Sequence, residues 1–267
     1  EDDLEIELLG QEDQSLCDFS GLLPSLFPFL IDWAGAHQAG YLRKLGFGVI
    51  ASLASAFRQP ASFDRFGLPL IPLLNATLFQ ADHAPLCFWE DPEQLEARSG
   101  IVRNAAFCAA ALVSAAGSEA LARYSCFYPA FCAVLDSKIV NGLAKDNAVG
   151  GMARLLQALL RQPDSAQRAE LRAMMERIIR ALPLKHDIAE NAAPVSVLLS
   201  CLKRHELDLD DHLPQIVESL GSILSQPQIS EGLEPWSRKE VLDCLQEISK
   251  SGSPSAPQAL ELLRSSC

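Results

Sequence analysis

The sequence predicts an all-α protein, built as a right-handed α-solenoid in which helical hairpins stack side by side. Three observations support this prediction. Apolar residues recur at helical spacing along most of the chain. Asn104, Asn147 and Asn191 stand 43 and 44 residues apart, and each is followed by Ala and a small, apolar segment. No alternating apolar–polar run is bounded by Asn-Gly or Asp-Gly, so strands are not expected.

The predicted helices follow one another with short breaks between them. In the first, at 19–35, Pro24 and Pro28 fall near the first turns, where a missing N–H costs least. In the second, at 38–57, Gly46 and Gly48 are expected to let another helix approach closely. The remaining helices are expected at 62–79, 100–117, 118–136, 143–160, 165–182, 187–205, 210–226, 236–251 and 255–266, with prolines at several of the breaks between them.

The length of the repeat indicates the kind of solenoid. The order of helices gives about five hairpins of roughly 40–45 residues and a terminal half repeat, which is typical of HEAT or armadillo arrays. Such hairpins cannot bury their apolar faces alone, so neighbours stack and form a concave surface. We therefore expect an acidic segment at 1–15 and a single HEAT-repeat solenoid at 16–267, and the start without Met suggests a fragment of a longer chain. An irregular helical bundle is the alternative.

The net charge of the chain indicates which class of partner it can bind. The formal net charge is −12, and residues 1–13 alone hold seven acids and no base. A chain of this kind is a poor ligand for a nucleic-acid backbone. Clustered carboxylates attract Lys-rich segments over about a Debye length. The sequence therefore predicts basic polypeptides as partners, and no direct contact with nucleic acid.

Enzymatic, metal, cofactor and membrane functions are not predicted. The chain has no GxSxG, HExxH or phosphate-binding loop, and charges or prolines interrupt each apolar run before it reaches the length of a membrane span. His83 and Cys87 are four residues apart, but no second pair accompanies them. The Gly150–Gly151 pair is expected to permit close helix packing. Five cysteines are expected to be reduced core residues: Cys108, Cys126, Cys132, Cys201 and Cys244.

The row formed by Asn104, Asn147 and Asn191 has two interpretations. On successive second helices of a solenoid, these side chains would recur along the concave face. Each amide has donors and an acceptor, so it can pair with the N–H and C=O of an extended peptide. Asp146 and Glu190 each precede an Asn and would select Lys or Arg in that peptide. In the structural interpretation, each Asn instead bonds the preceding loop or an adjacent repeat.

A long acidic connection is expected at 81–97, between two helices of a hairpin. It contains Trp89 and Glu93, and Glu96 follows shortly. One interpretation is a surface loop with its aromatic side chains packed onto the hairpin. The other is a contact loop for a basic partner, in which Trp89 and Glu93 take part.

The segments "IVRNAAFCAAALVSAAG", "KDNAVGGMARLLQALL" and "IIRALPLKHDIAENAAPVSVLLSCLKRH" resemble the C-terminal HEAT repeats of importin-β-type nuclear transport receptors (karyopherin-β), closest to the importin-four branch. The resemblance is firm over 98–205 and fainter over 16–80 and 206–267. One feature departs from the family. HEAT repeats often carry Arg two residues before this Asn, whereas here Val102, Lys145 and Ala189 stand there and Arg103 is shifted by one. An Asp–Arg ladder between repeats is therefore not expected.

The resemblance implies a receptor that shuttles between cytoplasm and nucleus and carries basic cargo, such as histones H3 and H4 or ribosomal proteins. It also implies Ran-GTP binding through N-terminal repeats that this chain lacks, and low-affinity contacts with Phe-Gly nucleoporin repeats. The cargo-binding residues expected from the pattern are Asn104, Asn147, Asn191, Asp146, Glu190, Glu93 and Trp89. The alternative function is a HEAT-repeat scaffold that holds folded partners, of the phosphatase- or proteasome-regulator type.

Overall fold

A computed structural model describes residues 22–35, 38–56, 60–80, 92–161, 168–226 and 235–266. These residues are all-helical, and none of them lies in a strand. The α-helices are α2 (Leu23–Ala34), α3 (Gly40–Ala56), α4 (Pro60–Gly67), α5 (Ile71–Phe79), α6 (Pro92–Ser114), α7 (Ser118–Tyr124), α8 (Phe127–Asp136), α9 (Gly142–Leu160), α10 (Arg168–Ala181), α11 (Ala192–Arg204), α12 (Leu213–Ser225), α14 (Pro235–Lys250) and α15 (Ala256–Ser266).

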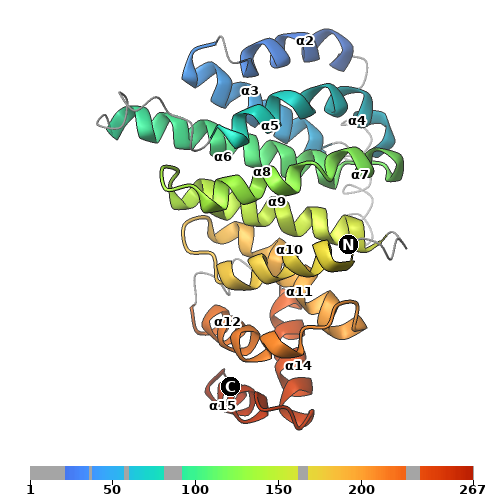
Figure 1. The fold of residues 1–267 in the computed structure, drawn as a ribbon, viewed down its shortest axis with the longest axis vertical. Helices are drawn as coiled ribbons and strands as arrows, with labels where there is room; N and C mark the ends of the chain where they lie inside the picture. Colours follow the sequence, from blue (N-terminus) through green and yellow to red (C-terminus); the bar gives the residue numbers. More distant parts are fainter. Residues whose placement is uncertain are drawn as a thin grey trace, which may run out of the picture.

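The helices stack in chain order, from α2 at one end to α15 at the other (Figure 1). One layer contains α3, α6, α9, α11 and α14, each in contact with the next. In a second layer α5 contacts α8, α10 contacts α12, and α12 contacts α15. Contacts such as α2 with α3 and α8 with α9 join the layers. This order is compatible with the α-solenoid predicted from the sequence.

A continuous apolar core lies between the two layers. Near the N-terminal end, Phe27 of α2 packs edge-on against Phe63 of α4, with 5.6 Å between ring centroids. In the middle, Phe127 and Phe131 of α8 are fully buried. Helix α6 is rich in buried Ala, which has no bulky side chain to hold its neighbours α3 and α9 away. Small residues on α6 therefore set the close spacing of this layer.

Several predicted boundaries were wrong, and proline explains part of the difference. The helix expected at 62–79 is divided into α4, a 3-10 turn at Leu68–Leu70, and α5. Pro69 and Pro72 lack the N–H that a continuous helix would use there. The helix expected at 118–136 is likewise divided into α7 and α8. The acidic connection expected at 81–97 is shorter, because α6 already begins at Pro92.

The glycines expected to allow close packing do so. A Cβ on Gly46 would lie 2.8 Å from the backbone nitrogen of Ala34 in α2. A Cβ on Gly48 would lie 3.1 Å from the amide nitrogen of Asn104. A Cβ on Gly151 would lie 2.6 Å from the ring of Phe131 in α8. The absence of a side chain at these positions thus admits a neighbouring element.

Replacing Gly46 with Ala is expected to lower the free energy of unfolding by about 1–3 kcal/mol, because the backbone of α2 cannot yield as a flexible side chain can. The matched control is Gly100→Ala in α6. There the new Cβ would meet only the Lys44 side chain at 3.4–3.5 Å, and a better helix former replaces glycine, so stability is expected to stay level or rise. Urea unfolding of both variants measures the difference. Equal effects of the two changes would contradict the close approach.

Candidate functional site

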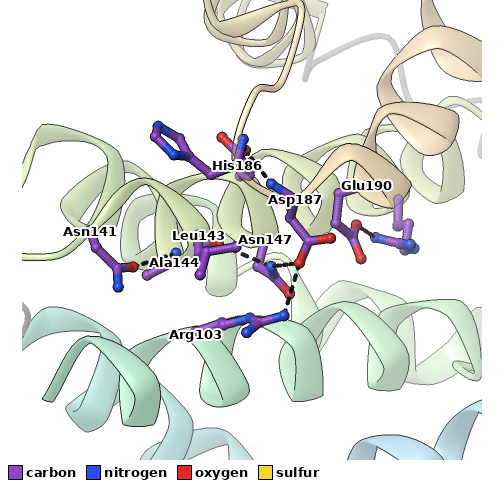
Figure 2. Close-up of polar contacts among 10 residues, drawn as sticks. Arg103, Asn141, Leu143, Ala144, Asn147, His186, Asp187 and Glu190 are labelled. Carbon is purple, nitrogen blue, oxygen red and sulfur yellow. Dashed lines mark hydrogen bonds and ion pairs between the residues drawn. The ribbon is translucent and has the colours of Figure 1, made fainter. Parts of the chain in front are cut away.

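Asp146, in the second turn of α9, anchors the connection that leads to α11. Its Oδ2 accepts hydrogen bonds from the backbone N–H groups of His186 (2.7 Å) and Asp187 (2.8 Å), as Figure 2 shows. Only 7% of the residue is exposed. The carboxylate therefore acts on the protein's own backbone, and it does not stand open to a Lys or Arg of a partner.

Asn147 lies next to it and is also buried. Its Nδ2 donates to the carbonyl of Leu143 (3.0 Å) and to Oδ2 of Asp187 (2.8 Å) (Figure 2). The same oxygen of Asp187 accepts from Nη2 of Arg103 on α6, at 3.2 Å. Asp187 therefore links α6 to α9. The sequence predicted no ladder of Asp–Arg pairs, and here one such pair joins these two helices. The pair is formed by the Arg shifted one position from the usual place.

Asn191 is fully buried at the end of the 3-10 turn Ile188–Asn191. Its Oδ1 accepts from the N–H of Leu184 (2.9 Å), and its Nδ2 donates to the carbonyls of Leu184 (2.9 Å) and Ile188 (3.0 Å). The amide thus pairs with both backbone groups of one residue. This is the geometry expected for a bound peptide, but the peptide is the protein's own segment 184–188.

Asn104 is the most open member of the row and is half-buried. Its Nδ2 donates to the carbonyl of Lys44 in α3, at 2.8 Å. Each Asn of the row therefore bonds a group of this chain, as in the structural interpretation. The bonds differ, however: Asn104 contacts α3, whereas Asn147 and Asn191 contact the connection between α10 and α11.

Glu190 forms an ion pair with Arg154 on α9, with 2.6 Å between Oε2 and Nη1 (Figure 2). The Glu190 side chain is 9% exposed and the Arg154 side chain 27%. Gly150 makes room for this carboxylate, because a Cβ there would overlap Oε2 of Glu190. The second predicted cargo-selecting acid is therefore neutralised by a base of the same chain.

The remaining predicted residues lie near the start of α6. Glu93 is exposed in the first turn of that helix, and Trp89 lies outside the described residues. Glu96, which follows Glu93 in the sequence, accepts from Nδ2 of Asn141 at 3.1 Å. Asn141 in turn caps α9, since its Oδ1 accepts from the N–H of Ala144 at 3.1 Å (Figure 2). Of the predicted cargo-binding carboxylates, Glu93 is exposed, whereas Asp146 and Glu190 are buried.

Sequence reasoning missed Arg103, Arg154 and Asp187 as partners in this network. Each partner lies 36 to 84 residues away along the chain, and no local spacing reveals such pairs. Asp187 did carry one signal, because Asp is favoured directly before a helical turn, and the turn Ile188–Asn191 begins at the next residue. The structure therefore shows a polar seam between α6, α9 and segment 184–191, formed mainly by groups that satisfy one another.

Burial suppresses the reactivity of three of the thiols. It raises the pKa of Cys201 and Cys244 to about 12, with nearby Glu206 adding to the effect at Cys201. Burial also raises the pKa of the Cys108 thiol. Thiols of this kind stay protonated at neutral pH and are poor nucleophiles. Among the described residues, Cys126, Cys132 and Cys244 are only half-buried, and all five predicted cysteines are free.

Two further classes of site are absent from the described residues. No three side chains of His, Cys, Asp or Glu gather there in a way that would hold a metal ion. His83 and Cys87 lie outside that part of the chain. In the same part, no helix combines the length and the apolar character needed to cross a bilayer.

Comparison with known proteins adds no assignment: no protein-family model matches the chain, and no curated protein matches it either.

Proposed function

We propose that this chain is a HEAT-type α-solenoid segment of a nuclear transport receptor that binds basic segments of cargo proteins. The observation that supports this most is the single layer of successive second helices, α3, α6, α9, α11 and α14, in an acidic chain. Such a layer offers an extended surface to a long, flexible partner. The importin-β resemblance of segment 98–205 gives the proposal its transport role, with shuttling between cytoplasm and nucleus.

Within this proposal, the polar seam has a positioning role. Asn147, Asn191, Asp146 and Glu190 bond groups of the same chain and are almost completely buried. They fix the spacing of α9 and α11 and leave cargo contact to other side chains. These four residues thus hold in place the helices that form the proposed binding surface.

We assign the first contacts with cargo to the acids around the start of α6. Glu93 is exposed there, and the sequence places Asp82, Glu90 and Asp91 shortly before it. Trp89 lies among these acids in the sequence, and its ring offers a cation–π contact to Lys or Arg. Carboxylates interleaved with an aromatic side chain suit a Lys-rich segment.

Titration calorimetry with a lysine-rich histone-tail peptide tests the proposal. We expect binding that weakens between low salt and about 0.15 M salt, because exposed charges are screened over a Debye length. Glu93→Gln is expected to lower affinity several-fold, since it removes one carboxylate and keeps the shape. The matched control is Glu261→Gln on α15, which is also exposed and lies at the far end of the stack.

The outcomes separate the candidate functions. Salt-dependent binding that Glu93→Gln weakens and Glu261→Gln does not would support cargo capture at α6. Equal effects of the two variants would assign the affinity to overall charge and overturn the placement at α6. Absence of binding at both salt concentrations would overturn the proposal for this chain. Tight binding of folded proteins that is insensitive to salt would favour the scaffold function.

A further inference from the structure

One side of helix α3 is open to solvent. Four residues on it follow the i, i+3, i+4, i+7 pattern of a single helix side: Tyr41, Lys44, Leu45 and Gly48. The first three are exposed, and Gly48 is half-buried. On the opposite side of the helix, Ile50 is completely buried in the core. Helix α3 therefore presents one mixed polar and apolar side to a partner.

Helix α6 has a matching open side, and three contacts join the two. Between residues 99 and 113 of α6, only Arg103, Asn104 and Phe107 are not buried. The Nδ2 of Asn104 donates to the carbonyl of Lys44 at 2.8 Å, and a Cβ on Gly48 would lie 3.1 Å from the same nitrogen. The stem of Lys44 lies over α6, 3.4–3.5 Å from the position of a Cβ on Gly100. We name the joint area, formed by the four residues of α3 with Arg103 and Asn104, the α3–α6 surface.

Asn104 can bind a peptide backbone in a way that the other two Asn residues of the row cannot. Its one hydrogen bond uses Nδ2, and its Oδ1 makes no hydrogen bond to any described residue. That oxygen is also not enclosed, since it is not among the buried polar atoms that lack a partner. An amide in this state still offers an acceptor and a second N–H. Beside it, a Cβ on Gly48 would meet no other group within 4 Å, so a backbone can approach closely.

The charge on the α3–α6 surface is basic, although the chain has a net charge of −12. Helix α3 contains two bases and no acid, and α6 contains no acid over residues 97–114. Of the two bases, Arg43 is half-buried and donates to the hydroxyl of Thr77 at 3.3 Å. Lys44 is exposed and forms no ion pair with a described residue. The ammonium group of Lys44 is therefore available to an anionic group of a partner.

Arg103 adds a second base, and the nearest acids are already engaged. Its side chain is 41% exposed, and its ion pair with Asp187 (Figure 2) uses one of the five N–H donors of a guanidinium. Asp187 is less exposed, at 20%. Glu96, one turn before the open side of α6, accepts from Nδ2 of Asn141 at 3.1 Å. The bases are thus the more accessible charges of this area.

We propose that the α3–α6 surface binds an extended, acidic segment of a partner protein. Carboxylates of this segment pair with Lys44 and Arg103, and its backbone pairs with the amide of Asn104. Tyr41 and Leu45 contact the aliphatic parts of its side chains. Because this partner is acidic, the inference is independent of the basic-cargo proposal and concerns a second binding surface.

A polypeptide fits this surface better than a nucleic acid does. A nucleic-acid strand carries a continuous row of phosphates, which an acidic chain repels as a whole. A short acidic peptide needs only the local bases. At about 0.15 M salt the Debye length is about 8 Å, so distant acids of the chain are screened while a carboxylate in contact with Lys44 is not.

Fluorescence anisotropy with a labelled ten-residue glutamate peptide at about 0.15 M salt tests the proposal. Lys44→Gln is expected to weaken binding several-fold, because it removes the charge and keeps most of the stem. Asn104→Ala is expected to weaken it as well. The matched control is Lys239→Gln on α14, which removes an equally exposed lysine outside the surface. Urea midpoints of all variants show whether each keeps its fold, and Lys44→Gln is expected to match the parent chain because Lys44 has no ion pair to lose.

The outcomes decide the proposal. Binding that Lys44→Gln weakens and Lys239→Gln leaves unchanged would support an acidic segment on the α3–α6 surface. Equal effects of these two variants, or no binding of the glutamate peptide, would overturn it. Tighter binding of a ten-nucleotide oligothymidine, also lost in Lys44→Gln, would overturn it too, because a nucleic acid would then be the occupant.

Discussion

Replacing Asn191 with Ala is expected to lower the free energy of unfolding by about 2–3 kcal/mol. The change removes an amide that accepts from the N–H of Leu184 and donates to the carbonyls of Leu184 and Ile188. Asn191 is fully buried. Water therefore cannot reach these backbone groups to replace the hydrogen bonds that the amide made. A buried unpaired polar group costs more than the bond itself contributes.

Urea unfolding monitored by circular dichroism measures this loss, and Asn104→Ala is the matched control. Asn104 is half-buried and makes one bond, to the carbonyl of Lys44. Water can reach the vacated carbonyl there, so a loss of about 1 kcal/mol or less is expected. If Asn191 instead served a bound peptide, its replacement would change peptide affinity and leave stability nearly unaltered. That result would contradict the role given to it here.

Local patterns in the sequence predicted most helices of the fold. Apolar spacing placed α3, α9 and α11 within a few residues of their observed ends. The predicted helix boundaries were wrong where a proline lacks the backbone N–H that a continuous helix needs, as at Pro69 and Pro72. They were also wrong where a polar stretch forms part of a helix. The first two turns of α6 are an example of such a polar stretch. Glu93 and Glu96 lie on this helix, although the sequence predicted an acidic connection there.

The candidate site was predicted only in part, for a physical reason. The spacing of the three Asn residues left a peptide-binding and a structural interpretation open, and in the structure each amide bonds groups of this chain. Their partners are contributed by residues distant in sequence, such as Asp187 for Asn147 and Lys44 for Asn104. An amide that can bind a foreign backbone can bind the chain's own backbone equally well, and sequence alone does not say which backbone is nearer.

The acids beside the Asn row have a different role in the structure from the one predicted, because they are buried. In the sequence Asp146 and Glu190 read as charges available to a basic partner. In the structure one carboxylate holds two backbone N–H groups and the other holds Arg154. Their charges therefore stabilise a connection inside the protein. The acidic character that remains for a partner belongs to exposed residues such as Glu93.

Replacing Arg154 with Ala is expected to lower the free energy of unfolding by roughly 2 kcal/mol. Glu190 would keep its charge at a position where its side chain is 9% exposed, and it would lose the partner at 2.6 Å. Breaking a buried pair costs about 3–5 kcal/mol, and the 27% exposure of Arg154 reduces that figure because water screens the pair. Urea unfolding of the variant gives the measurement.

A second change separates the charge effect from lost packing. In the double variant Arg154→Ala with Glu190→Gln, no unpaired charge remains, so about half of the lost stability is expected to return. Gly150→Ala perturbs the same pair from the opposite side, because its Cβ would overlap Oε2 of Glu190, and it should also destabilise the protein. If the double variant were as unstable as Arg154→Ala alone, the stem of Arg154 would matter through packing, and the ion pair would contribute little to the joint between α9 and the segment preceding α11.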